Sequence, residues 1–314
     1  MSVAYGKRCP RYETPETKAL FDVETEKNLL IEPGALPPLD FFPFLRYIPE
    51  WTGLAGWKQR ARECRKHQRV LYFGLLDETL GRIERGEENG CHMEEIIRRQ
   101  RELRLDREMI AYLGGTLLEG GSDTSSGVLE SVILLMIAFP EVQKKAQAEL
   151  DRVVGPHRLP VLGDLPELPY VRAIIQEARV SFRPAAPLIP HSTNAPEEYK
   201  GFLIPKDTIL FVNTWGILHD PEMYDDPESF NPDRYLLAEN GTKLGVDGSD
   251  CRTNLVFGCG RSLNTMRLLW AFMFSRATDL QTGAPIDVDI DNYEKVRNHA
   301  PVLFQSVTFD VFRE

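Results

Sequence analysis

One long apolar stretch, from Asp106 to Phe139, restricts the fold of this chain more than any other feature of its sequence. Its pattern predicts a single long helix that glycine and polar residues interrupt. Pro140 and Glu141 then begin a second helix, because proline suits the first helical position and an acid suits the positive end of the helix dipole. The longest apolar run, Val132 to Phe139, is far shorter than a membrane span. The stretch therefore predicts a helical fold without a membrane-spanning segment.

The rest of the sequence predicts helices in the first half and short strands in the second. Helical spacing of apolar residues marks segments 57–85, 93–103, 168–180 and 263–274. The buried stripe of the first segment is predicted to hold Val70, Leu71, Phe73, Leu75, Leu76, Leu80 and Ile83. After Pro184, prolines become frequent and short apolar strands are predicted at 201–204, 208–212 and 306–312. We therefore predict a mainly α fold with a small β portion, formed as a single domain over residues 1–314.

Charge and cysteine usage exclude several classes of protein. A net charge of −10 argues against nucleic-acid binding, and the basic stretch 58–69 is interpreted as a solvated helix face. The five cysteines are odd in number and contain no CxxC, which argues against a disulfide framework and a zinc site, and for a reducing compartment. The N-terminus has no apolar run of a signal peptide. We therefore expect a soluble, cytoplasmic protein without a metal site.

The candidate catalytic residues lie inside the long apolar helix, in the segment 119–127. Two adjacent glycines weaken a helix and let a ligand approach its backbone. Asp123 and Thr124 place an acid and a hydroxyl at this weak point. A carboxyl among apolar residues is expected to have a raised pKa, which suits proton delivery. The alternative is structural, with Ser122 and Asp123 as an ordinary helix N-cap after a glycine turn.

Two further segments contain candidate residues. The turn-rich loop 226–235 holds one arginine, Arg234, for which a structural salt bridge to Glu177 is predicted. The tight loop Gly258-Cys259-Gly260 comes directly before a helix. Cys259 is either a thiolate ligand of a metal or haem or, as lone cysteines more often are, a small buried apolar residue.

Taken together and in order, these segments resemble the cytochrome P450 family, in particular fungal enzymes of secondary and xenobiotic metabolism. Asp123 and Thr124 fall on the acid–alcohol pair of the family's long oxygen-activating helix, and residues 230–235 resemble its arginine-bearing loop. The resemblance covers nearly all of the chain and implies a partial cytochrome P450-like fold. It also implies a haem cofactor, and if haem binds, His191 and Arg261 are the residues expected to contact it.

Two departures from the family pattern concern the N-terminus and the ExxR motif. The N-terminal third of the family, with its usual endoplasmic-reticulum anchor, has no counterpart in this chain. In the motif that begins at Glu177 the arginine should fall at position 180, which is Val180. Arg179 and Arg183 are near this position but out of register.

The third departure removes the cysteine that would bind haem. The family pattern FGxGRRxCxG begins correctly at Phe257 but breaks after Arg261, where about a dozen residues are missing. Asn264 stands where simple counting places the cysteine, and Cys259 occupies the variable position. Family chemistry needs an axial thiolate on iron. We therefore expect no bound haem and no metal, with Cys259 as the thiol nearest to the lost ligand position.

Three functions are compatible with this sequence. The first is a haem-free enzyme of fungal natural-product biosynthesis that catalyses a non-oxidative cyclisation or isomerisation of a terpenoid-like substrate, with Asp123 as the acid. The second is a truncated or mis-spliced copy of a cytochrome P450 monooxygenase that hydroxylates an apolar substrate. The third is a non-catalytic scaffold or apolar-ligand binding protein. The expected partner is an apolar small molecule, and an exposed core face is compatible with a homodimer.

Overall fold

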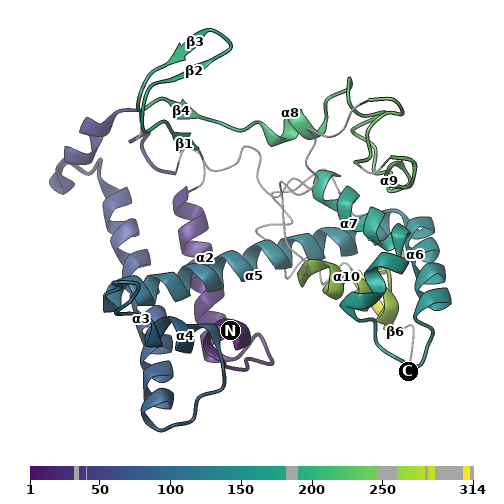
Figure 1. Cartoon of the computed structure of the whole chain (residues 1–314), viewed down its shortest axis with the longest axis horizontal. Helices are drawn as coiled ribbons and strands as arrows, with labels where there is room; N and C mark the ends of the chain where they lie inside the picture. Colours follow the sequence, from purple (N-terminus) through teal and green to yellow (C-terminus); the bar gives the residue numbers. More distant parts are fainter. Residues whose placement is uncertain are drawn as a thin grey trace. The chain divides into compact units, whose positions relative to one another are not determined.

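The computed structural model describes residues 1–31, 35–39, 41–181, 190–238, 240–246, 260–279, 282–286 and 307–311. The chain divides into two compact units, Met1–Asp123 (unit 1) and Thr124–Glu314 (unit 2), and each is described by itself. Helix α5 (Arg107–Ala138) contributes residues to both (Figure 1). The single domain over 1–314 stays a prediction.

Helices make up most of the described residues, and the strands form antiparallel pairs. The α-helices besides α5 are α1 (Ser2–Tyr5), α2 (Pro15–Ile31), α3 (Gly56–Glu84), α4 (His92–Arg98), α6 (Pro140–Val153), α7 (Pro169–Ser181), α8 (Thr214–Leu218), α9 (Arg234–Leu237) and α10 (Gly260–Ala271). Short 3-10 helices cover Pro43–Tyr47, Glu50–Thr52 and Leu162–Glu167. The strand pairs are β1 (His191–Ser192) with β4 (Ile209–Leu210), β2 (Glu197–Tyr199) with β3 (Phe202–Ile204), and β5 (Phe272–Arg276) with β6 (Val307–Val311). The predicted mainly α fold with a small β portion is confirmed.

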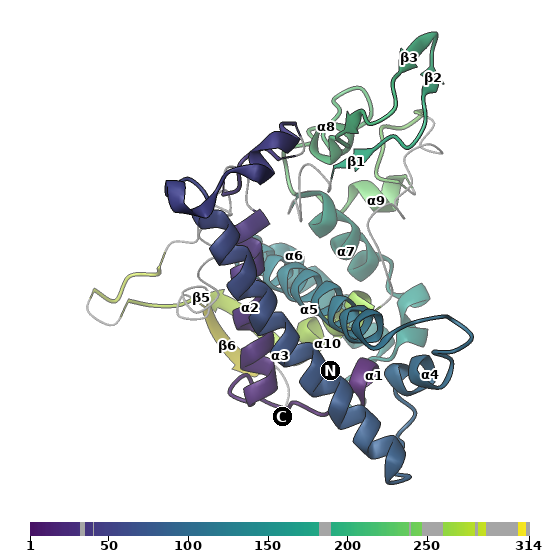
Figure 2. The same ribbon diagram turned by 90° about the vertical axis from the view of Figure 1, so that its left-hand side faces the viewer.

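Unit 1 is a helical assembly in which α2 and α3 lie side by side (Figure 2). Its buried cluster takes Leu71 and Leu75 from α3, which share one face because they are four residues apart. Val70 was predicted to belong to this stripe, and that prediction is wrong: its side chain is 72% exposed. Each residue of a helix is rotated by about 100° from the one before it, so Val70 turns away from the face of Leu71.

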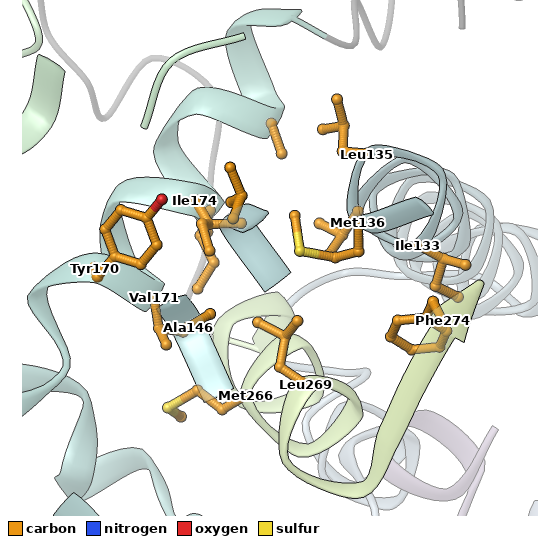
Figure 3. Close-up of a cluster of buried hydrophobic side chains, with 14 of the residues drawn as sticks. Ile133, Leu135, Met136, Ala146, Tyr170, Val171, Ile174, Met266, Leu269 and Phe274 are labelled. Carbon is orange, nitrogen blue, oxygen red and sulfur yellow. The ribbon is translucent and has the colours of Figure 1, made fainter. Parts of the chain in front are cut away.

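Unit 2 is built around a buried apolar cluster of α6, α7, α10 and the C-terminal part of α5 (Figure 3). Figure 3 shows Met266 and Leu269 of α10 on the same side of the cluster as Ala146 of α6 and Val171 of α7. Each of these four side chains is fully buried. The apolar positions of α6 and α7 recur at helical spacing, so that each helix turns one face into this core.

Two glutamines of α6 determine where α10 ends and β5 begins. Gln143 Nε2 donates to the carbonyl of Phe274 at 3.1 Å, and its Oε1 accepts from the amide of Phe274 at 2.8 Å. Gln147 Nε2 donates to the carbonyls of Leu269 at 3.3 Å and Phe272 at 3.0 Å. The sequence predicts a helix over the whole of segment 263–274, and this prediction is wrong for the last three residues. The helix ends at Ala271, because the side chains of Gln143 and Gln147 bind the backbone of the strand that follows.

The described part of the chain contains no single helix that is long and apolar enough to cross a membrane. Among the described helices, one pair, α5 and α6, is long and apolar enough when the two are taken together, and the pair is bent by 109°.

Glu94 in α4 organises the loop that precedes this helix in unit 1. Its fully buried carboxylate accepts from the amides of Asn89 at 3.2 Å and Gly90 at 2.8 Å, and lies 3.4 Å from Arg82 Nη2. Burial by itself raises the pKa of Glu94, but the two backbone donors and Arg82 outweigh it, so the pKa is lowered. The folded state therefore favours the ionised form.

We expect Glu94→Gln to destabilise the protein by about 2 kcal/mol at neutral pH, because hydrogen bonds to a charged group are lost. Because the pKa of Glu94 is lower in the folded than in the unfolded protein, ionised Glu94 stabilises the folded state at pH values above the unfolded pKa of glutamate. This stabilisation is lost as the pH falls through the folded-state pKa. The difference between wild type and variant in urea unfolding should therefore shrink in acid. Exposed Glu84→Gln is the control, and a pH-independent difference would contradict the prediction.

Candidate functional site

The segment that holds Asp123 and Thr124 lies in the interior of α5. The helix runs unbroken from Arg107 to Ala138, so the alternative of a helix N-cap at Ser122 and Asp123 is wrong. Both residues therefore have helical backbones with the rest of α5. Their side chains lie outside the described ones, and the catalytic roles of Asp123 and Thr124 stay predictions.

Glu119, one turn before Asp123 on α5, is the centre of a polar cluster in unit 1. Its side chain is only 8% exposed. The Tyr72 hydroxyl of α3 donates to its Oε1, and Gln68 Nε2 of the same helix lies 3.3 Å from that oxygen. Lys27 Nζ of α2 lies 2.5 Å from Oε2. One carboxylate thus joins α2, α3 and α5.

The chemistry of Tyr72 agrees with its role as a donor to Glu119. Burial raises the pKa of the Tyr72 hydroxyl, and the hydrogen bond to Glu119 raises it further. The phenol therefore keeps its proton and donates a hydrogen bond to the carboxylate.

A second buried glutamate, Glu24 of α2, contacts α5 beside this cluster. Glu24 is 2% exposed, and its Oε1 lies 2.6 Å from Ser122 Oγ. Ser122 Oγ also lies 2.8 Å from the carbonyl of Leu118, four residues earlier in α5. Since Glu119 and Ser122 are three residues apart, both point to the same side of the helix. This side of α5 is polar at the point where the sequence predicts catalysis.

The sequence analysis identified neither the buried Glu24 of α2 nor the side chains that surround Glu119. Leu20, Val23 and Glu24 are the buried residues of α2, so a charged side chain belongs to the apolar stripe of that helix. A glutamate at such a position is the available signal, because carboxylates are rarely buried without partners. Which residue on which helix supplies those partners depends on packing that sequence spacing does not give.

Two glycines of α5, Gly115 and Gly121, allow a matched test of whether α3 packs closely against α5. A Cβ at Gly115 would lie 2.5 Å from three ring carbons of Tyr72, while a Cβ at Gly121 would meet nothing within 4 Å. We expect Gly115→Ala to destabilise the protein by about 2 kcal/mol through overpacking. Gly121→Ala should instead stabilise it by about 0.5–1 kcal/mol, since alanine is the better helix former. Urea unfolding measures both, and equal effects would contradict the expectation.

In unit 2 the structure brings Glu177 and Arg234 together. Glu177 of α7 is 1% exposed, and its Oε2 lies 3.3 Å from Arg234 Nε. Its Oε1 accepts from the amide of Asn231 at 2.8 Å. The guanidinium group of Arg234 also donates to four loop carbonyls, those of Asp225 at 2.8 Å, Asp226 at 3.1 Å, Ser229 at 2.8 Å and Asn231 at 3.2 Å. A buried ion pair and main-chain hydrogen bonds thus fasten loop 225–231 to α7.

The residues expected to contact haem, His191 and Arg261, are only partly described by the structure. His191 lies exposed in β1, opposite Leu210 of β4. Arg261 belongs to α10, but its side chain lies outside the described ones. Asn264, at the counted cysteine position, is exposed on α10. Cys251 and Cys259 lie outside the described residues, so the predicted loss of the thiolate stays a prediction.

The described cysteines lie far along the chain from the segment expected to hold the haem thiolate. The described cysteines, Cys9, Cys64 and Cys91, all belong to unit 1. Burial, with the negative charges of Glu26 and Glu119, raises the pKa of the Cys64 thiol and favours the protonated form. Among the residues that the structure describes, no group of three or more His, Cys, Asp or Glu is placed to hold a metal ion.

Comparison with known proteins identifies the family of this chain. The family model described as Cytochrome P450 matches residues 1–261. A cytochrome P450 monooxygenase of Armillaria gallica is 41% identical and is matched over 97% of this chain and 60% of its own length. One of Arthrobotrys oligospora is 36% identical over 92% of this chain and 57% of its own length. The macC monooxygenase of Penicillium terrestre is 33% identical over 93% of this chain and 58% of its own length. The chain thus spans less than two thirds of these relatives.

Solved structures agree with these sequence matches. A zebra fish cytochrome P450 structure with progesterone superposes with a TM-score of 0.66 at 25% identity and covers 89% of this chain and 64% of its own. A second zebra fish structure, with abiraterone, has a TM-score of 0.65 at 22% identity and covers 92% of this chain. The partial cytochrome P450-like fold expected from the sequence is confirmed, and this chain belongs to the cytochrome P450 family.

Proposed function

We propose that the protein to which this chain belongs is a monooxygenase that oxidises an apolar small molecule in fungal secondary metabolism. The observation that carries this proposal is the buried Glu177–Arg234 pair, which fastens loop 225–231 to α7 in a chain whose relatives are monooxygenases. These residues fall on the ExxR glutamate and the arginine-bearing loop of the family. The presence of this buried pair supports descent from an active monooxygenase.

In this proposal, the chain's own residues do two things. Asp123 and Thr124 provide an acid and a hydroxyl in the glycine-weakened segment of α5, where they hold and move a proton at the carboxyl and hydroxyl oxygens. Glu177 and Arg234 keep loop 225–231 rigid through main-chain contacts. Apolar small molecules are the proposed substrates, because the family binds small molecules and this chain is rich in apolar side chains.

A specific observation favours a second candidate function. The family model match ends at Arg261, where the cysteine pattern breaks in the sequence. The match with the Armillaria relative extends over 318 positions, more than the 314 residues of this chain, so the relative has positions with no counterpart here. A chain without the axial cysteine would use acid–base chemistry at Asp123 to cyclise or isomerise a terpenoid-like substrate without haem.

An absorption spectrum separates the two candidates. The full chain is expressed with added haem precursor, purified, reduced and exposed to carbon monoxide. A thiolate-type Soret band that Cys259→Ser removes and Cys64→Ser leaves would support monooxygenation by this chain. A folded protein without haem that converts an apolar precursor without NADPH or a reductase would overturn the first candidate and support the second.

A further inference from the structure

Two adjacent glycines, Gly120 and Gly121, form a weak point in the middle of α5. Both are exposed, and a Cβ at either position would meet nothing within 4 Å, so the space beside the pair is open. Glycine is less favourable than alanine inside a helix, because it loses more backbone freedom on folding. The helix nevertheless runs unbroken through this point, from Arg107 to Ala138. Contacts made by the residues on either side of the glycine pair therefore matter for the helix here.

Both neighbours of the glycine pair contact other helices of unit 1. Glu119, before the pair, accepts from the Tyr72 hydroxyl of α3 and lies 2.5 Å from Lys27 Nζ of α2. Ser122, after the pair, has its Oγ 2.6 Å from Glu24 Oε1 of α2. Glu24 and Lys27 are three residues apart on α2, so they lie on one side of that helix. One side of α2 thus contacts α5 both before and after the glycine pair.

We propose that Lys27 and Tyr72 are positioning residues that keep the glycine pair of α5 helical and so fix the place of Asp123. Each contacts Glu119, whose side chain is only 8% exposed, so water competes little for these interactions. Asp123 follows the pair by two residues, and a change of helix geometry at the glycines would displace its backbone. This role rests on the proposed function, because the place of Asp123 matters only if Asp123 performs chemistry.

The same contacts couple α2 to the predicted catalytic segment. A movement of α2 that lengthens the distance from Lys27 to Glu119 removes support from the residue before the glycine pair. Ser122 Oγ also lies 2.8 Å from the carbonyl of Leu118, one turn earlier, and bonds of this kind bend helices. Loss of the contacts with α2 therefore favours a bent or locally opened α5 beside Asp123.

Hydrogen–deuterium exchange of the purified full chain at neutral pH tests this role without haem or substrate. In the wild type, amides 119–124 should exchange faster than amides 71–76 of α3, which lie in the buried cluster of unit 1, because the glycine pair opens locally. Lys27→Met removes the charge and should speed exchange at 119–124 about tenfold. Tyr72→Phe, which removes only the hydroxyl, should act in the same direction. Lys18→Met, at an exposed position of α2, is the matched control and should change nothing.

Two rescues separate positioning from a general loss of stability. Lys27→Arg keeps the cation and should exchange like the wild type. Gly121→Ala, added to Lys27→Met, should slow exchange at 119–124 again, because alanine favours the helix without outside support. Exchange at 119–124 that neither Lys27→Met nor Tyr72→Phe changes would overturn the proposal, as would a double variant without rescue. The measurement needs no turnover, so failure of the monooxygenase proposal would leave the exchange result intact.

Discussion

Replacing Glu177 by alanine is expected to destabilise the protein by about 4 kcal/mol, because the Arg234 charge stays buried without its anionic partner. Arg234 is 9% exposed and Glu177 1% exposed, so solvent does not replace the lost interaction. The amide of Asn231 loses its acceptor at the same time. Urea unfolding of the full chain, followed by circular dichroism, measures the effect.

Two variants control for this result. Glu177→Gln keeps an oxygen for the amide of Asn231 and removes only the charge, so its effect should be smaller than that of alanine. Glu197 is exposed in β2, and Glu197→Ala should change the stability by no more than about 0.5 kcal/mol. A Glu177→Ala variant as stable as Glu197→Ala would show that the loop is not held by this pair.

Replacing Leu269 by alanine is the second large effect, with an expected loss of about 3 kcal/mol. Leu269 of α10 is completely buried in the cluster of unit 2, where α10 packs against α6 and α7 (Figure 3). Removal of a buried leucine side chain loses its transfer free energy and leaves a cavity that packed helices fill only partly. The shift of the urea unfolding midpoint reports the loss.

Two matched substitutions show whether packing is the cause. Leu269→Met conserves most of the volume and should cost less than about 1.5 kcal/mol. Leu203 in β3 is 72% exposed, and Leu203→Ala should be close to neutral. If Leu269→Ala were also neutral, α10 would not be part of the core of unit 2, and the helix would have to pack elsewhere.

Local sequence patterns predicted the helices well. The segment 57–85 corresponds to α3 (Gly56–Glu84), and Pro140 begins α6 as its position in the sequence predicts. The long apolar stretch became α5, because apolar spacing and length together leave little choice. The predicted strand 306–312 contains β6 (Val307–Val311). These elements are encoded by residues close to one another in the chain.

Contacts between distant residues could not be predicted in the same way. Local spacing predicts a helix as far as residue 274, but the helix ends at Ala271 and β5 begins at Phe272. The reason is distant in sequence, since Gln143 and Gln147 bind the backbone of this segment from more than 120 positions away. Glu24 and Glu119 form their clusters with side chains of other helices. The pairing of Glu177 with Arg234 could be named in advance only because each residue falls on a recognisable family segment.

The loop around Arg234 also bears on how this part of the protein can diverge. Its guanidinium group holds Asp225, Asp226 and Ser229 through their main-chain oxygens, not through their side chains. Every amino acid has such an oxygen, so substitution at Asp225 takes no partner away from the arginine. Lysine at position 234 would lack the planar fork that reaches several carbonyls at once. Selection for the shape of this loop therefore falls chiefly on Arg234 and its partner Glu177, while an exposed position such as Asp225 can change without loss of a contact to the arginine.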